Sequence, residues 1–179
     1  GVRKVKGGLF SNWINEQLAI GNSISVMAPQ GRFFVPIEPR SKRHHVGIAG
    51  GSGITPILSI MKTVLGREPG SRFTLIYGNR MLRSTMFKEE LEDLKNKYMT
   101  RLVLNHVFSD DPTDAPLNMG VMNRDKIAEF LGHVLPAGAI DQLLQRGVVV
   151  RGHVVAQLHR RAKSPARVAL DDEQRDRPV

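Results

Sequence analysis

A glycine-rich segment that joins a short apolar run to an amphipathic helix pattern constrains this chain most. Residues 46–49 (Val-Gly-Ile-Ala) are typical of a buried strand, and residues 50–56 follow with Gly-Gly-Ser-Gly-Ile-Thr-Pro. Thr55 is predicted to cap a helix and Pro56 to open it, since both are favoured there. Apolar residues then recur at helical spacing up to a predicted stop at Gly66: Ile57, Ile60, Met61 and Val64.

The alternation of strand and helix patterns continues along the chain. Strands are predicted at residues 73–77 and 102–108, and helices at residues 84–98 and 123–131. Strands that alternate with helices pair in parallel through right-handed crossovers. The sequence therefore predicts an α/β fold with a doubly wound parallel sheet over residues 44–141.

The first 40 residues do not follow this alternation. Residues 10–18 have helical spacing of apolar residues, residues 24–27 (Ile-Ser-Val-Met) predict a short strand, and residues 29–31 predict a turn. Pro36, Pro39 and the polar run 40–43 are typical of an interdomain linker. Because so short a segment lacks a core of its own, residues 1–40 are expected to be the end of a larger domain that begins upstream.

The composition changes near residue 142. All ten aromatic residues lie between Phe10 and Phe130, and residues 142–179 hold 8 Lys and Arg against 4 Asp and Glu. The run 171–178 is polar and is expected to be disordered, whereas Gly147–Val150 is expected to form a short strand. The tail thus contributes much of the net charge of +9 and of the pI of about 10.4.

The high pI keeps a nucleic-acid-binding protein among the hypotheses, although only the charge supports it. The chain has no Cys, which excludes Cys-ligated zinc and iron–sulfur centres within it. The apolar runs are shorter than the roughly 20 residues that a membrane-spanning helix needs. No metal site is predicted, and His44 and His45 are expected to be a surface pair.

The segment Gly51, Ser52, Gly53, Thr55 and Pro56 is the strongest candidate binding motif. Glycines allow close approach of a ligand, helix N-termini attract anions, and ligands bind beyond the carboxyl ends of parallel strands. The segment matches neither the Walker A loop nor the Gly-x-Gly-x-x-Gly fingerprint. The alternative is a glycine-rich turn without a ligand.

A second candidate motif follows the strand at residues 73–77. Asn79, Arg80, Arg83 and Ser84 provide two guanidinium groups and a hydroxyl that can bind a phosphate. The alternative is a solvated loop with ordinary surface arginines.

The third candidate motif precedes the first helix. Gly8, Leu9, Phe10 and Ser11 combine free amides with a hydroxyl, which is typical of an anion-binding nest. The alternative is a plain turn into a helix.

Together these motifs resemble the ferredoxin–NADP⁺ reductase superfamily. The resemblance rests on Gly-Gly-Leu-Phe-Ser at 7–11, Pro-Gln-Gly-Arg-Phe at 29–33, Ala-Gly-Gly-Ser-Gly-Ile-Thr-Pro at 49–56 and Tyr-Gly-Asn-Arg at 77–80. It covers about residues 1–141 and is greatest for the reductase components of phenylacetyl-CoA epoxidase and related multicomponent oxygenases. The superfamily joins an FAD-binding β-barrel to an α/β domain that binds NAD(P)H. The resemblance implies that residues 1–40 end the barrel and that residues 44–141 form the nucleotide domain.

The resemblance also implies roles for the three motifs. Gly8 to Ser11 would hold the FAD pyrophosphate, and Thr55 would lie near the flavin–nicotinamide contact in a pocket shaped by Gly53 and Pro56. The motif at residues 79–84 would face the adenosine end of the dinucleotide. Its two arginines favour NADPH over NADH, because a 2′-phosphate needs cationic partners. No catalytic residue is predicted, since hydride transfer from NADPH to flavin needs no side-chain acid or base.

The implied protein is a cytoplasmic oxidoreductase that passes electrons from NADPH through FAD to an iron–sulfur domain or oxygenase component. In the intact family member a ferredoxin-like domain holds a [2Fe–2S] cluster, whose four Cys ligands this chain lacks. The flavin-binding Arg-x-Tyr-Ser/Thr strand is also missing. We therefore expect the chain as it stands not to retain FAD, and an NADP-binding module without flavin is the alternative.

The chain departs from the family again after Asp141. The family continues into a strand that ends in a Cys-Gly-Pro motif, whereas this chain continues with Gln-Leu-Leu-Gln-Arg-Gly at 142–147. Residues 142–179 are interpreted as a divergent basic tail. A shifted reading frame and genuine divergence are the two explanations.

Overall fold

The computed structural model describes residues 2, 4–28, 30–133, 135, 140–146 and 162–169. The chain divides into two compact units, Gly1–Gly31 and Arg32–Val179. Residues 32–40, which the sequence assigns to the preceding domain, group with the second unit; the predicted limits 1–40, 44–141 and 142–179 stay predictions. In the described part of the chain, no helix is both long and apolar enough to cross a membrane.

The first unit contains one helix, α1 (Leu9–Glu16), as the spacing of apolar residues predicts. Gly7 has φ +75°, which a glycine adopts without strain, and this turn brings the Gly8 amide within 2.9 Å of the Val5 carbonyl oxygen. The rings of Phe10 and Trp13 pack with their centroids 5.7 Å apart on one side of α1.

The predicted strand at residues 24–27 is wrong, because these residues form no ladder with another described segment. A strand is stabilised by its pairing, and an apolar alternation alone does not supply a partner.

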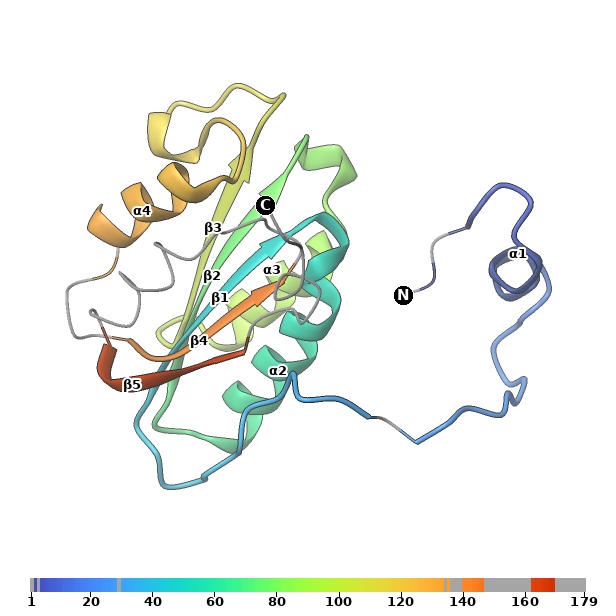
Figure 1. Ribbon diagram of the computed structural model, residues 1–179, viewed down its shortest axis with the longest axis horizontal. Helices are drawn as coiled ribbons and strands as arrows, with labels where there is room; N and C mark the ends of the chain where they lie inside the picture. The colour runs from blue at the N-terminus through green and yellow to red at the C-terminus, as the bar shows by residue number, and fades with distance from the viewer. Residues whose placement is uncertain are drawn as a thin grey trace, which may run out of the picture. The chain divides into compact units, whose positions relative to one another are not determined.

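The second unit is built on a parallel sheet, which confirms the predicted α/β fold (Figure 1). The strand order is β3-β2-β1-β4-β5, and each neighbouring pair is parallel. The strands are β1 (His44–Gly50), β2 (Arg72–Asn79), β3 (Leu102–Phe108), β4 (Ile140–Arg146) and β5 (Ala162–Ala169). The order reverses at β1, where the chain crosses from one side of the sheet to the other.

Among the residues that the structure describes, three helices and three short 3-10 turns connect the strands. The helices are α2 (Ile54–Arg67), α3 (Lys88–Lys97) and α4 (Arg124–His133), and the turns are η1 (Gly51–Gly53), η2 (Leu82–Ser84) and η3 (Pro116–Asn118). Gly53, not Thr55, is the N-cap of α2, and the helix continues through Gly66 to Arg67. α3 begins four residues later than predicted because Phe87 at its N-cap has φ 58° and interrupts the helix.

Two apolar clusters cover the two faces of the sheet. One cluster joins β1, β2 and β3 to α2 and α3, with Ile57, Met61, Phe73, Leu75 and Leu91 fully buried. The other joins Ile48 and Ile76 to Ile127, Phe130 and Leu131 of α4. In Figure 1, α4 accordingly lies on one side of the sheet and α2 and α3 on the other. This two-sided burial explains why the middle of β1 and of β2 is almost entirely apolar.

β4 extends beyond residue 141, where the composition changes. It pairs with β1 from His45↔Gln142 to Ala49↔Arg146, and Leu143 and Leu144 are buried in opposite clusters. The chain therefore stays in the sheet as far as Arg146. The predicted strand at Gly147–Val150 lies outside the described residues.

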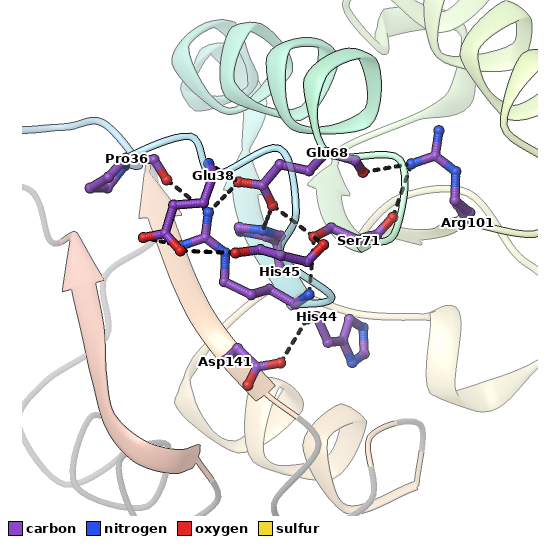
Figure 2. A network of polar contacts seen from close by, with 10 residues as sticks. Pro36, Glu38, His44, His45, Glu68, Ser71, Arg101 and Asp141 are labelled. Atoms are coloured by element: carbon purple, nitrogen blue, oxygen red, sulfur yellow. Dashed lines mark hydrogen bonds and ion pairs between the residues drawn. The ribbon is translucent and has the colours of Figure 1, made fainter.

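A network of polar contacts around the carboxylate of Glu68 holds the amino-terminal end of the sheet together (Figure 2). The side chain of Glu68 is fully buried. Its Oε1 accepts hydrogen bonds from an Arg43 guanidinium nitrogen and, at 2.9 Å, from the Glu38 amide. Its Oε2 lies 2.7 Å from the donating Ser71 hydroxyl and 3.2 Å from His45 Nε2. Burial alone would raise the pKa of Glu68, but these hydrogen bonds, with Arg43 first, lower it to about 2.

The network fastens the segment that precedes β1 to the rest of the second unit. Arg43 also donates a hydrogen bond of 2.8 Å to the Pro36 carbonyl, and its amide lies 3.0 Å from Ser71 Oγ. Arg101 secures the turn after α2, because its guanidinium donates to the carbonyls of Leu65, Glu68 and Ser71 at 2.8–3.1 Å. Residues 36–43 therefore do not behave as a solvated linker.

The prediction of His44 and His45 as a surface pair is wrong, because both are buried. His44 Nε2 lies 2.8 Å from Thr74 Oγ1, and its amide donates to Asp141 Oδ2 at 2.8 Å. His45 stacks on Phe73 and contacts Glu68. Burial lowers the pKa of His45 more than the nearby Glu68 raises it, so His45 is neutral at pH 7. No metal-binding group of His, Asp or Glu occurs among the described residues.

Replacement of Glu68 by Gln is expected to lower the free energy of unfolding by about 3–5 kcal/mol, because it leaves the Arg43 charge without its anionic partner. Urea denaturation of the full chain, followed by circular dichroism, measures the change. Glu90→Gln is the matched control, since Glu90 forms an exposed pair with Lys62 and such pairs contribute about 0–1 kcal/mol. Equal losses in the two variants would contradict the central role of Glu68.

The free energy of unfolding is expected to fall as the pH drops from about 6.5 to 2. Both Glu68 and His45 have folded pKa values below their unfolded ones, so protons bind the unfolded chain more readily. The Glu68 shift from 4.5 to about 2 corresponds to a loss of about 3 kcal/mol, concentrated below pH 5. Urea titrations between pH 7 and pH 3 test this, and Glu68→Gln should have a flatter profile below pH 5.

Candidate functional site

The candidate site lies at the carboxyl edge of β1 and β2, which are neighbours in the sheet. Gly50 at the end of β1 is paired with Gly78, and Asn79 is paired with Phe108 at the end of β3. The glycine-rich motif at residues 51–56 and the arginine motif at residues 79–84 therefore leave the sheet at the same edge. In open parallel sheets this edge, where the strand order reverses, is where ligands bind.

The first motif forms an open turn into α2. Gly51 has φ +49°, a left-handed value that favours glycine, and a side chain added there would meet nothing within 4 Å. Gly51 and Ser52 are exposed, whereas Gly53 is buried and caps α2 without a side-chain hydrogen bond. The structure therefore presents Gly51 and Ser52 to solvent, with the positive end of the α2 dipole beside them.

Two contacts hold this turn in place. The Tyr77 hydroxyl donates a hydrogen bond of 2.9 Å to the Gly51 carbonyl, which ties β2 to the turn. Burial, the largest effect, raises the pKa of Tyr77, so the hydroxyl stays protonated and remains a donor. Thr55 Oγ1 donates to the Ser52 carbonyl at 3.0 Å, and Thr55 and Pro56 are half-buried.

The second motif leaves β2 as an exposed loop. The Arg80 side chain is 80% exposed, and Arg83 and Ser84 in η2 are exposed as well. The Ser84 hydroxyl donates to the Met81 carbonyl at 2.9 Å. Asn79 is half-buried, and its side chain hydrogen-bonds to the Tyr77 hydroxyl, which lowers the pKa of Tyr77 against the larger effect of burial. Asn79 thus lies next to the tyrosine that holds the Gly51 turn.

Two aspartates that the sequence analysis did not select complete this edge. Arg80 Nε donates a hydrogen bond of 3.0 Å to Asp110 Oδ2, and one terminal nitrogen of the guanidinium lies 3.0 Å from the same oxygen in an ion pair. Asp111 Oδ2 accepts the Leu82 amide at 2.6 Å. Hydrogen bonds, first from Ser109 and then from Arg80, hold the pKa of Asp110 below its ordinary value, so it is ionised at neutral pH. The signal was present in the sequence, because two carboxylates directly follow β3 at the edge where β2 ends.

The third motif belongs to the first unit and is described separately. Gly8 is the N-cap of α1, without a side-chain hydrogen bond to cap the helix. A side chain at Gly8 would lie 2.5 Å from Ser11 Oγ, so the backbone passes close to this hydroxyl. Leu9 and Phe10 are exposed, and Ser11 Oγ accepts the Val5 amide at 3.2 Å. The structure therefore brings Gly8, Leu9, Phe10 and Ser11 together at one helix terminus.

Comparison with known proteins identifies the second unit. The family of the oxidoreductase NAD-binding domain matches residues 48–144, more than half of the chain. One of the subunits of 1,2-phenylacetyl-CoA epoxidase from Escherichia coli (strain K12) is 43% identical over 126 residues, which are 70% of this chain and 35% of that protein. The ferredoxin reductase component of 3-ketosteroid-9-alpha-monooxygenase from Rhodococcus rhodochrous is 40% identical over 106 residues, 59% of this chain and 29% of that protein. The chain thus spans about a third of the length of these relatives.

Solved structures have the same fold. The ferredoxin-NADP⁺ reductase from Plasmodium falciparum superposes with a TM-score of 0.65 at 22% identity, covering 92% of this chain and 65% of that one. The cytochrome P450 reductase GcoB from Amycolatopsis superposes with a TM-score of 0.63 at 26% identity, covering 93% of this chain and 49% of that one. By these matches and by its parallel sheet, the chain belongs to the oxidoreductase NAD-binding domain family, within the ferredoxin–NADP⁺ reductase superfamily that its motifs resemble.

Proposed function

We propose that this chain binds NAD(P)H at the carboxyl edge of β1 and β2, as part of a cytoplasmic flavin-dependent reductase. The reductase would pass electrons through FAD to an iron–sulfur centre of an oxygenase system such as phenylacetyl-CoA epoxidase. The observation that carries the proposal is the open, positive-φ turn at Gly51 beside the arginine loop, in a chain that matches an oxidoreductase NAD-binding domain. The epoxidase and monooxygenase relatives support the class of electron acceptor.

The residues at this edge fit a dinucleotide. The open space at Gly51, with the positive end of the α2 dipole beside it, suits a pyrophosphate, because no side chain blocks the close approach of a phosphate to the backbone. Arg80 and Arg83 supply cations to the adenosine end, and Asn79 precedes them at the end of β2. Thr55, with Gly53 and Pro56, would border the nicotinamide. NADPH and NADH are both candidates, since they differ only by a 2′-phosphate.

The first unit supports a place for FAD. The amides of Leu9, Phe10 and Ser11 open α1, and the first amides of a helix have no partner within it. Without a capping side chain at Gly8, these amides suit the flavin pyrophosphate. When bound, the two cofactors supply hydride transfer from nicotinamide to flavin. The chain's own part in that chemistry is to bind and orient, and no side chain is assigned as an acid or base.

A nucleotide-binding module without flavin is the second candidate. The second unit, Arg32–Val179, contains its own two-sided core and the whole dinucleotide edge, and this observation favours the alternative. The absorbance of the purified chain after incubation with FAD and desalting separates the two. Retained yellow colour supports the reductase. Colourless protein that still binds NADPH, which is the result expected for the chain as it stands, supports the module.

Replacement of Arg80 by Ala is expected to weaken NADPH binding by about 1.5–3 kcal/mol, or roughly 10- to 150-fold in Kd, the range for a hydrogen bond to a charged group. The loss should be smaller for NADH, which lacks the 2′-phosphate. Isothermal titration calorimetry of the full chain measures both. Arg67→Ala is the control, because this exposed arginine ends α2 at the opposite end of the helix. If the wild-type chain bound neither dinucleotide, the proposed function would be wrong.

A further inference from the structure

The Arg80 guanidinium is already engaged by a carboxylate. Its Nε donates to Asp110 Oδ2 at 3.0 Å, and one terminal nitrogen lies 3.0 Å from the same oxygen. The backbone fixes the pair, since the Asp110 amide donates to the Arg80 carbonyl at 2.9 Å and the Ser109 amide donates to the Asn79 carbonyl at 3.1 Å. The Ser109 hydroxyl holds the other oxygen, Asp110 Oδ1, at 2.6 Å. The pairing is therefore a built feature of the edge rather than a chance approach of two long side chains.

The charges at this edge are balanced. Arg80 and Arg83 contribute two positive charges, and Asp110 and Asp111 contribute two negative charges. The carboxylate of Asp111 is occupied by the Leu82 amide, which leaves Asp110 as the acid that faces Arg80 directly. The Asp110 side chain is 32% exposed, so an incoming ligand meets the carboxylate as well as the guanidinium.

A 2′-phosphate and a 2′-hydroxyl interact differently with the Arg80–Asp110 pair. A phosphate monoester carries about −1.5 to −2 charges at pH 7, so it must compete with Asp110 for Arg80 and is repelled by the carboxylate. A ribose hydroxyl is a donor as well as an acceptor, and it can donate to a carboxylate without charge repulsion. The same two residues therefore oppose one ligand and accept the other.

We propose that Asp110 is a specificity-determining residue of the dinucleotide site. It withholds Arg80 from a 2′-phosphate and so reduces the preference for NADPH over NADH that the two arginines alone would produce. The inference rests on the proposed binding of NAD(P)H at this edge. The contrary role is that Asp110 orients Arg80 to receive the 2′-phosphate. In that case, removing the charge of Asp110 would weaken the binding of a ligand that has a 2′-phosphate.

The test compares 2′,5′-ADP with 5′-AMP, two probes that differ only in the presence of a 2′-phosphate, by isothermal titration calorimetry of the full chain. Asp110→Asn keeps the shape of the side chain and removes its charge. It is expected to tighten binding of 2′,5′-ADP by about 5- to 30-fold, as for removal of one charge close to a dianion near the surface, and to leave the affinity for 5′-AMP within about twofold. The gain should shrink in 0.5 M salt, because exposed charges are screened.

Two controls isolate the pair. Asp114→Asn removes an exposed acidic charge from the same connection between β3 and α4 and should change neither affinity by more than about twofold. In an Arg80→Gln background, Asp110→Asn should lose at least half of its effect on 2′,5′-ADP, because Asp110 then has no guanidinium to withhold. Thermal unfolding of each variant verifies that it is folded.

The outcomes separate the inference from the proposed function. Weaker binding of 2′,5′-ADP to Asp110→Asn would assign Asp110 the orienting role and overturn the inference. An unchanged ratio of the two affinities, or an undiminished gain in the Arg80→Gln background, would overturn it as well. If wild-type protein bound neither probe nor NADPH nor NADH, the proposed function would fail and the inference with it.

Discussion

The buried carboxylate of Glu68 is the interaction on which the second unit depends. An ion removed from water is stable only when its hydrogen-bonding capacity is filled, and five groups converge on the carboxylate and the adjoining turn: Arg43, the Glu38 amide, Ser71, His45 and Arg101. These groups come from the segment before β1, from β1 itself and from the turns that lead into β2 and β3. The contacts at and around this one anion therefore tie together the starts of three neighbouring strands.

Much of the fold could be predicted from the sequence, because the residues that recur with helix or strand periodicity are the residues that are buried. The apolar runs in β1, β2 and β3 and the helical spacing in α2 and α4 are each long enough to specify one state. The strand at residues 24–27 was wrong because its apolar residues found no partner. The burial of His44, His45 and Glu68 could not be predicted from the neighbouring sequence, since it depends on contacts between residues more than twenty positions apart.

For the candidate site, the position could be predicted from the sequence but the balance of charges could not. Glycine spacing and the position after a strand located Gly51 to Pro56 and Asn79 to Ser84 at one edge, because parallel strands end together. The charge balance of that edge was not predictable from the arginines alone. Asp110 and Asp111 lie about thirty residues beyond Arg80, and only the β2–β3 register brings them beside it. The structure thus adds an acidic component to a site that had been inferred from its basic residues.

The attachment of residues 35–43 to the second unit has a practical consequence for dissecting this protein. Val35 is buried against the α2 side of the sheet, and Pro36, Glu38 and Arg43 take part in the contacts around Glu68. A minimal version of the nucleotide-binding unit that started at His44, where the sheet starts, would leave the buried Glu68 carboxylate without its Arg43 and Glu38 donors. One that started at Arg32 would keep every donor to that carboxylate. The boundary for recombining this unit with other electron-transfer modules therefore lies about a dozen residues ahead of its first strand.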